Sequence, residues 1–181
     1  MAAYAGTGGV SLFAVQFAKV VGARVISTTS SAEKAELLRK LGADHVVNYR
    51  QTSAWGLEAK RLTGGIGVDL VVDVTGPSGL GQSVKSLRLD GIVAVVGAIA
   101  GFGGDAEVPT ILDSWTNLFT SRGVWVGTRL QMEDMCRAIE GNIEQLRPVL
   151  DTKVFKLAEL KEAYKYVEDG GYLGKVCVEI S

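Results

Sequence analysis

Short apolar stretches alternate along this chain with amphipathic stretches and with turns that are rich in glycine. The apolar stretches, most of them rich in β-branched residues, predict strands over residues 2–5, 24–28, 46–49, 69–74, 92–96 and 123–127. The stretches between them predict helices over residues 10–21, 32–41, 53–62, 80–89 and 111–120. Strands this apolar must be covered on both faces. The pattern therefore indicates an α/β fold with a doubly wound, parallel, six-stranded sheet and helices on both sides.

The last third of the chain departs from this simple alternation. It predicts helices over residues 131–146 and 157–168, an extended segment over 149–155 and a final strand over 175–180. Pro148 follows the first of these helices and ends it, because proline cannot continue a helix. We find no internal repeat and no low-complexity linker, so the last third is expected to belong to the same domain.

Composition and charge narrow the class of protein without naming a reaction. The 181 residues are 47% hydrophobic and 22% charged, with a net charge of -1, which is typical of one globular domain. This balance gives no basic patch that would favour nucleic acid. No apolar run is long enough to cross a membrane, and the N-terminus lacks the pattern of a secretory signal. A cytoplasmic location is the resulting expectation.

The first turn of the fold, Gly6-Thr7-Gly8-Gly9, lies between the first strand and the first helix. A glycine turn at this place lets the backbone approach a pyrophosphate closely, and the helix N-terminus then holds the anion. The pattern Gly-x-Gly-x-x-Gly is met at Gly6 and Gly8, whereas Ser11 stands at the third glycine. Serine is small, so close packing of helix on strand is still expected. The apolar residues at helical spacing are Val10, Phe13, Ala14, Phe17, Ala18 and Val21.

The end of the second strand indicates which dinucleotide would bind. A fold of this kind that prefers NAD usually carries Asp or Glu there, to bind the ribose 2′-hydroxyl. This chain instead has the hydroxyls of Thr29, Ser30 and Ser31, with Lys34 one turn into the next helix. Hydroxyls and a cation accept a 2′-phosphate, so we predict NADP(H) over NAD(H), with Tyr49 covering the adenine. The alternative is that Ser31 only caps the helix and Lys34 is solvated.

Several motifs together resemble the medium-chain dehydrogenase/reductase superfamily, in particular zinc-type alcohol dehydrogenases and quinone oxidoreductases. These motifs are Gly6-Thr7-Gly8-Gly9-Val10-Ser11, Gln16-Phe17-Ala18-Lys19, Lys40-Leu41-Gly42-Ala43-Asp44, Asn48-Tyr49-Arg50 and Gly174-Lys175-Val176. Their order and spacing match along nearly the whole chain. The resemblance implies a Rossmann cofactor domain, NADP(H) as the cofactor and hydride transfer as the reaction.

For individual residues, the resemblance implies contacts with three parts of the cofactor. It implies a pyrophosphate site at Gly6, Thr7, Gly8, Gly9 and Val10. It implies a 2′-phosphate site at Thr29, Ser30, Lys34 and Tyr49. It implies contacts with the ribose and nicotinamide at Thr75, Gly76, Val96, Gly97 and Ala98. These last residues follow the fourth and fifth strands, at the crevice where such folds bind ligands.

The resemblance also carries expectations about assembly. It implies that the strand from Gly123 to Gly127 pairs with its symmetry mate and extends the sheet across a homodimer. Full-length members of the superfamily carry an N-terminal, GroES-like catalytic domain about as long again. Residues 1–181 therefore resemble the NAD(P)-binding half alone: a fragment, a truncated product or a stand-alone protein.

Other chemistry finds little support in the residues. A catalytic zinc site needs several converging ligands, and His45, Cys136 and Cys177 do not form a set, so we expect no zinc. Hydrolysis by a Ser–His–Asp triad would need His45 as its base, and no nucleophile elbow accompanies it. Five tyrosines could donate a proton, but their spacing selects none, so no catalytic residue is named. The loop from Gly101 to Gly104 either closes over the nicotinamide or is a long turn.

Two classes of function therefore compete. The first is an NADPH-dependent oxidoreductase that transfers hydride to a small carbonyl, enone or quinone. The second is a nucleotide-binding module that works as a sensor or regulatory subunit, or whose cleft serves a reaction other than a redox one. A fold does not determine a function, so both stay open at this point.

Overall fold

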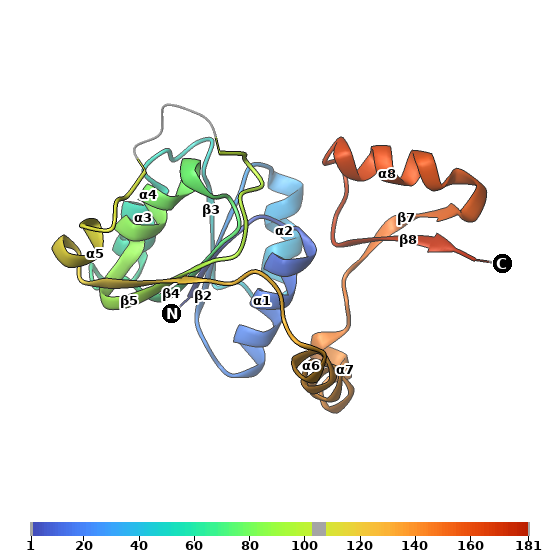
Figure 1. The fold of residues 1–181 in the computed structure, drawn as a ribbon, viewed down its shortest axis with the longest axis horizontal. Coiled ribbons are helices and arrows are strands. Elements are labelled where there is room, and N and C mark those ends of the chain that lie inside the picture. Colours follow the sequence, from blue (N-terminus) through green and yellow to red (C-terminus); the bar gives the residue numbers. More distant parts are fainter. Residues whose placement is uncertain (1, 103–107, 181) are drawn as a thin grey trace.

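The computed structural model describes residues 2–102 and 108–180 (Figure 1). Its strands are β1 (Ala2–Ala5), β2 (Val25–Thr29), β3 (His45–Asn48), β4 (Val68–Asp73), β5 (Leu87–Val95), β6 (Phe119–Gly123), β7 (Leu150–Lys156) and β8 (Lys175–Glu179). Its helices are α1 (Gly9–Val20), α2 (Ala32–Lys40), α3 (Trp55–Leu62), α4 (Pro77–Ser86), α5 (Asp113–Thr116), α6 (Arg129–Gly141), α7 (Ile143–Leu146) and α8 (Leu160–Glu168), with a 3-10 turn, η1, at Leu157–Glu159. Gly103 and Gly104, half of the loop predicted above, lie outside the described residues.

The first six strands are hydrogen-bonded in the order β3-β2-β1-β4-β5-β6, and every neighbouring pair is parallel. The expected α/β fold with parallel strands and interleaved helices is thus confirmed. The strand order reverses at β1, which is the switch point at which doubly wound folds open a crevice. Within the described residues, no helix has the length and apolar character needed to cross a membrane.

Apolar side chains form two cores, one on each face of the six-stranded sheet. Val25 and Ile26 are consecutive in β2 and point to opposite faces, because side chains alternate along a strand. One core lies beneath α1 and α2 and buries Leu12, Val15, Ala18, Val25, Leu38 and Ala43. The other lies beneath α3 and α4 and buries Ile26, Val47, Ala59, Val68, Val71, Val84, Leu87 and Val93. Both faces are covered, which explains the near-continuous apolar runs in the strand sequences.

The buried face of α1 differs from the one that the spacing suggested. Ser11, Leu12, Val15, Gln16 and Ala18 are buried, whereas Val10 is 50% exposed and Val21 is 78% exposed. The reason is that α1 turns its small and aliphatic residues to the strands. The Phe13 and Phe17 rings lie 6.2 Å apart on a half-buried flank. Ser11 packs at the position of the third glycine, as its size predicted.

Two predicted boundaries around β5 were wrong. The helix expected over 80–89 is α4, which starts at Pro77 and ends at Ser86. Proline is favoured in the first turn of a helix, where its missing N–H costs nothing. The strand expected over 92–96 is β5, which already starts at Leu87, so Asp90 and Gly91 lie inside this strand, at an irregularity of its ladder with β4. Asp90 has a φ of 59°. Asp90 N instead donates a hydrogen bond to Leu118 O at 2.7 Å.

The strand predicted from Gly123 to Gly127 was also wrong, because the sixth strand runs from Phe119 to Gly123. The helix predicted over 111–120 shrinks to the four residues of α5. Register with β5 sets this boundary: Gly91 pairs with Phe119 and Val95 with Gly123. Since β5 ends at Val95, the ladder offers no further partner. The last bond runs from Val124 N to Val95 O at 2.9 Å.

Beyond α7 the chain forms a C-terminal unit of β7, η1, α8 and β8, seen at the right of Figure 1. The strand predicted over 175–180 is β8, and it pairs with β7 in a separate parallel sheet against which α8 packs.

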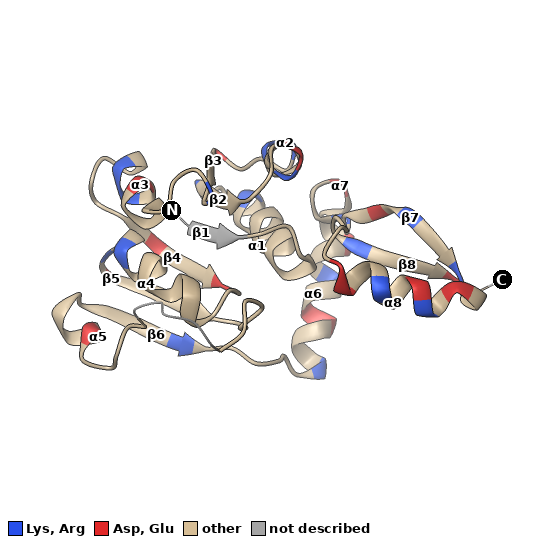
Figure 2. Ribbon diagram, turned by 90° about the horizontal axis from the view of Figure 1, so that it is seen from above, with Lys and Arg blue, Asp and Glu red and all other residues tan. Residues whose placement is uncertain are grey.

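Within this C-terminal unit, Phe155 and Tyr166 form an aromatic pair with ring centroids 5.6 Å apart. Burial, together with the nearby Asp151 carboxylate, raises the pKa of the Tyr166 phenol. Acidic and basic residues alternate along α8 (Figure 2).

Candidate functional site

The glycine-rich turn joins β1 to α1 and leaves the helix N-terminus open. Gly8 is the N-cap of α1 without a side-chain cap, and the first turn of the helix contains no acidic residue. Gly6 N donates to Thr28 O at 3.0 Å, which ties the turn to the end of β2. The uncapped N–H groups and the positive end of the helix dipole together make a suitable site for an anion.

Lys175 brings a positive charge to this turn from the far end of the sequence. A Cβ added at Gly9 would lie 2.5 Å from Lys175 Cε and Nζ, so the ammonium group rests against the first residue of α1. Gly174 N donates to Thr7 O at 3.3 Å and anchors the start of β8 to the same turn. Among the described residues Lys175 has no ion pair, so its charge is free to meet an anion.

Gly174-Lys175-Val176 is one of the motifs that carry the family resemblance, but its sequence alone predicts no role for Lys175. Lys175 comes near the turn because α7 is fastened to α1. Gln16 Nε2 donates to Gln145 O at 3.0 Å and to Arg147 O at 2.8 Å. Lys175 N then donates to Val149 O at 2.9 Å. This chain of contacts joins segments far apart in sequence, so local spacing carried no signal for it.

The hydroxyl-rich end of β2 serves partly as local structure. Ser31 Oγ accepts a hydrogen bond from Lys34 N at 3.2 Å. Ser31 therefore caps α2, which is the structural role that the alternative interpretation gave it. Thr29 is 2% exposed and its Oγ1 accepts from Ser31 N at 3.5 Å. Lys34 Nζ reaches across to Gly170 O of the C-terminal unit at 3.5 Å. Ser30 is half-buried beside them.

A cavity of about 340 Å³ opens next to the glycine turn and collects several of the predicted residues. It is lined by Gly6, Thr28, Tyr49, Trp55, Val74, Thr75, Ser78, Gly79, Ile99 and Ala100. Tyr49, which follows β3, and Thr75, which follows β4, thus line one cavity with Gly6 of the glycine turn. Trp55, the first residue of α3, lines the cavity too, although no role was predicted for it.

Asp73, the last residue of β4, holds the turn that borders this cavity. Its carboxylate is 1% exposed and accepts hydrogen bonds from Thr75 N at 2.8 Å, Thr75 Oγ1 at 2.9 Å, Gly76 N at 3.0 Å and Ser83 Oγ at 2.6 Å. Gly76 has a φ of 81°, and a Cβ there would lie 2.7 Å from Ala98 Cα. A side chain at that position would therefore push the turn after β4 away from the segment after β5.

The segment after β5 leads to a second cavity, also of about 340 Å³. Its lining is Val95, Val96, Gly97, Ala98, Phe102, Gly123, Val124 and Trp125. Val96 N donates to Asp73 O at 2.8 Å and Ile99 N donates to Val74 O at 3.0 Å. These hydrogen bonds hold the segment after β5, which lines the second cavity, against the end of β4, which borders the first. The predicted trio Val96, Gly97 and Ala98 lies here, at the carboxyl ends of β5 and β6.

The potential metal-binding side chains of the described residues are scattered. Within residues 2–102 and 108–180, no three His, Cys, Asp or Glu side chains gather into a group that could hold a metal ion. His45 is half-buried at the start of β3. Cys136 and Cys177 are both free thiols, and Cys136 is exposed.

Both the sequence and the fold of this chain are similar to those of known proteins. Residues 9–141 match the family described as zinc-binding dehydrogenase. A zinc-type alcohol dehydrogenase-like protein of Schizosaccharomyces pombe is 40% identical over 176 residues, which cover 97% of this chain and 50% of that protein. The crystal structure of a putative alcohol dehydrogenase from Sinorhizobium meliloti superposes with a TM-score of 0.87 at 37% identity, covering 99% of this chain and 50% of that one.

A mycobacterial protein whose structure is a complex with NADPH also superposes, with a TM-score of 0.79 at 28% identity, covering 99% of this chain and 57% of that one. The chain spans about half the length of the relatives that it matches. These matches confirm the resemblance to the medium-chain dehydrogenase/reductase superfamily. The chain belongs to the zinc-binding dehydrogenase family.

Proposed function

We propose that this chain binds NADP(H) and orients it for hydride transfer to a small carbonyl, enone or quinone. The observation that carries the proposal is the Lys175 ammonium group against the first residue of α1, beside an uncapped glycine turn and without an ion pair to any described residue. A cation and a helix N-terminus at one point are suited to a pyrophosphate. The nicotinamide cofactor, when bound, supplies the hydride.

The residues present fit such a dinucleotide along the whole crevice. Gly6, Thr7, Gly8, Gly9 and Val10 would surround the pyrophosphate, with Lys175 closing that part of the site. Tyr49 and Trp55 would flank the adenosine in the first cavity, and Thr75 and Gly76 would lie beside the ribose and nicotinamide. Val96, Gly97 and Ala98 would support the nicotinamide at the second cavity. The protein would thus contribute position and charge, which is the usual share of a protein in hydride transfer.

Selectivity for the 2′-phosphate is the first prediction. Calorimetric titration should give tighter binding of NADPH than of NADH, because Ser30 and Lys34 lie where NAD-preferring folds have a carboxylate. Lys34→Ala should lower NADPH affinity about tenfold and leave NADH affinity unchanged, since a charge-assisted hydrogen bond is lost. Lys40→Ala, on the same helix but outside the crevice, is the matched control. Equal affinity of the wild-type chain for both nucleotides would refute the preference.

Turnover is tested separately from binding. NADPH oxidation in the presence of a panel of enones and quinones would support the oxidoreductase function. Tight NADPH binding without oxidation of any acceptor would instead favour a nucleotide-binding module. The chain spans about half the length of its relatives, so either outcome describes the activity of these 181 residues alone.

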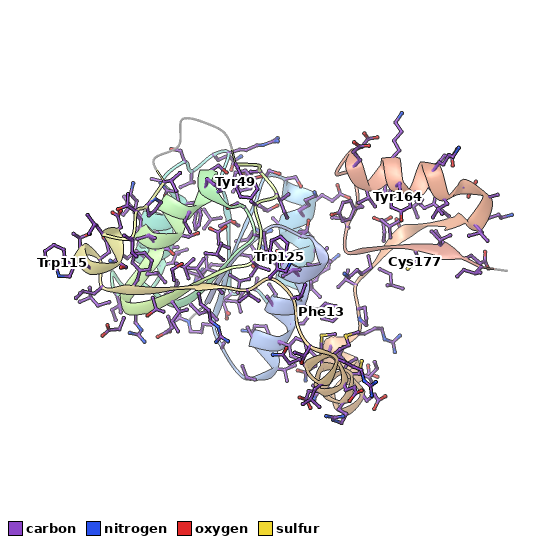
Figure 3. All side chains as sticks on the ribbon, in the orientation of Figure 1. Phe13, Tyr49, Trp115, Trp125, Tyr164 and Cys177 are labelled. Carbon is purple, nitrogen blue, oxygen red and sulfur yellow. The ribbon has the colours of Figure 1, made fainter. Side chains whose placement is uncertain are left out.

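The second prediction concerns assembly as a homodimer. β6 is the open edge of the six-stranded sheet, and the segment 124–127 continues it without a partner strand among the described residues. Trp125 is 90% exposed and Val126 is 79% exposed there, and such apolar edges favour pairing with a second strand. Trp115 is also exposed and points away from the sheet (Figure 3).

Sedimentation at micromolar concentration should therefore give the mass of a dimer. Val126→Lys should shift the chain to the monomer, because edge charges oppose pairing of strands. Ile180→Lys changes an equally exposed apolar residue elsewhere and should leave the dimer intact. A monomeric wild-type chain would contradict the proposal, as would equal dissociation by both variants.

A further inference from the structure

Asp151, the second residue of β7, is a buried carboxylate that lines neither of the two cavities. It is 7% exposed. Its Oδ1 accepts a hydrogen bond from Lys153 N at 2.8 Å, two residues along its own strand. Its Oδ2 accepts from Leu173 N at 2.7 Å, which lies 22 residues away in sequence. The Tyr166 hydroxyl lies 3.4 Å from both oxygens. A buried carboxylate is costly unless donors replace its water, so these contacts hold the group in one place.

The segment 173–175 runs between this carboxylate and the glycine turn, and its three consecutive amides donate hydrogen bonds on both sides. Leu173 N donates to the carboxylate at 2.7 Å, and Lys175 N donates to Val149 O, next to β7, at 2.9 Å. Between them, Gly174 N donates in the other direction, to Thr7 O of the glycine turn, at 3.3 Å. A Cβ at Gly174 would lie 2.3 Å from Val149 O, so glycine is required for this close approach.

These bonds decide how precisely the Lys175 ammonium group is placed. A lysine side chain has many rotamers, and an anion that binds it must order them. If the backbone of Lys175 were also mobile, the anion would have to order that as well, and affinity would fall further. Two of the three acceptors that fix the segment are backbone carbonyls. Asp151 supplies the third with its side chain, so this is the contact that a change of residue can remove.

We propose that Asp151 is a positioning residue of the nucleotide site: it acts through Leu173 to hold Lys175 where a pyrophosphate would bind. This inference rests on the proposed function, because it takes Lys175 as the cation that meets the pyrophosphate. Asp151 itself does not touch the nucleotide. The alternative is a purely structural role, in which Asp151 stabilises the C-terminal unit and affects binding through Lys175 no more than through any other contact.

Asp151→Asn tests the proposal with a side chain of the same size. Its single amide oxygen can keep the local bond from Lys153 N, and its amide nitrogen then faces Leu173 N, donor against donor. Calorimetry should show NADPH and NADH binding about five- to tenfold more weakly, because both contain the pyrophosphate. Adenosine 2′-monophosphate lacks a pyrophosphate, so its affinity should stay within about twofold of that of the wild type. Asp169→Asn, an exposed carboxylate of the same unit, is the matched control and should change none of the three affinities.

A double-mutant cycle with Lys175→Met separates positioning from a structural role. In the Lys175→Met background, Asp151→Asn should change NADPH affinity by less than about twofold, because the cation that it positions is already gone. The full five- to tenfold loss in that background would overturn the inference. An equal loss for adenosine 2′-monophosphate would also overturn it, since the damage would then be general, as would NADPH binding by Asp151→Asn that matches the wild type. A wild-type chain that binds neither dinucleotide is a different result, which removes the proposed function itself.

Discussion

Lys175→Met is expected to weaken NADPH binding about 10- to 100-fold, which corresponds to loss of one hydrogen bond to a charged group. The ammonium group lies against Gly9 at the open N-terminus of α1, where a pyrophosphate would have its charge neutralised. Methionine keeps an unbranched, apolar stem and lacks only the ammonium end of the lysine, so the packing of β8 should survive. Calorimetric titration with NADPH measures the effect, and urea denaturation checks that stability is unchanged.

Three further variants make this experiment specific. Lys175→Arg should retain most of the affinity, because a guanidinium also pairs with phosphate. Gly9→Ala should weaken binding without unfolding the chain, since the new Cβ meets only the flexible end of the Lys175 side chain. Lys161→Met, on α8 and away from the crevice, is the matched control. If Lys175→Met binds NADPH like the wild type, the assignment of the pyrophosphate site is wrong.

Asp73→Ala is expected to lower the free energy of unfolding by about 3–5 kcal/mol. The Asp73 carboxylate accepts hydrogen bonds from Thr75 N, Thr75 Oγ1, Gly76 N and Ser83 Oγ. Removing it leaves these donors without an acceptor, and at 1% exposure water cannot easily replace it. Urea denaturation measures the loss, and the released turn after β4 should weaken NADPH binding as well.

Asp73→Asn separates the hydrogen bonds from the bulk of the side chain. Its amide oxygen can still accept from Thr75 and Gly76, and its amide nitrogen can donate to Ser83 Oγ once that hydroxyl rotates. The loss should therefore be about 1–2 kcal/mol, clearly smaller than for alanine. Asp169→Ala, at the exposed end of α8, should change stability little. Equal losses in the asparagine and alanine variants would show that the network contributes less than its geometry implies.

Local patterns were sufficient for the class of fold and for part of the site. Near-continuous apolar runs required cover on both faces, and the two cores around Val25 and Ile26 supply that cover. The glycine turn before α1 and the Ser31 cap of α2 are also local, since each depends on residues within one turn of helix. These features depend on backbone preferences and near neighbours, so the residues themselves predict them.

Register and long-range contacts had to wait for the tertiary structure. Residues 123–127 have a good strand sequence, but β6 lies at Phe119–Gly123, because pairing with β5 determines which residues form the ladder. The buried side of α1 is likewise set by the strands beneath it. Lys175 meets Gly9 because the contacts of Gln16 hold the α7 segment against α1, and Asp73 gains its fourth donor, Ser83 Oγ, only when α4 packs over β4. Spacing along a chain reports neighbours within an element, whereas the energy of these contacts comes from segments that folding alone brings together.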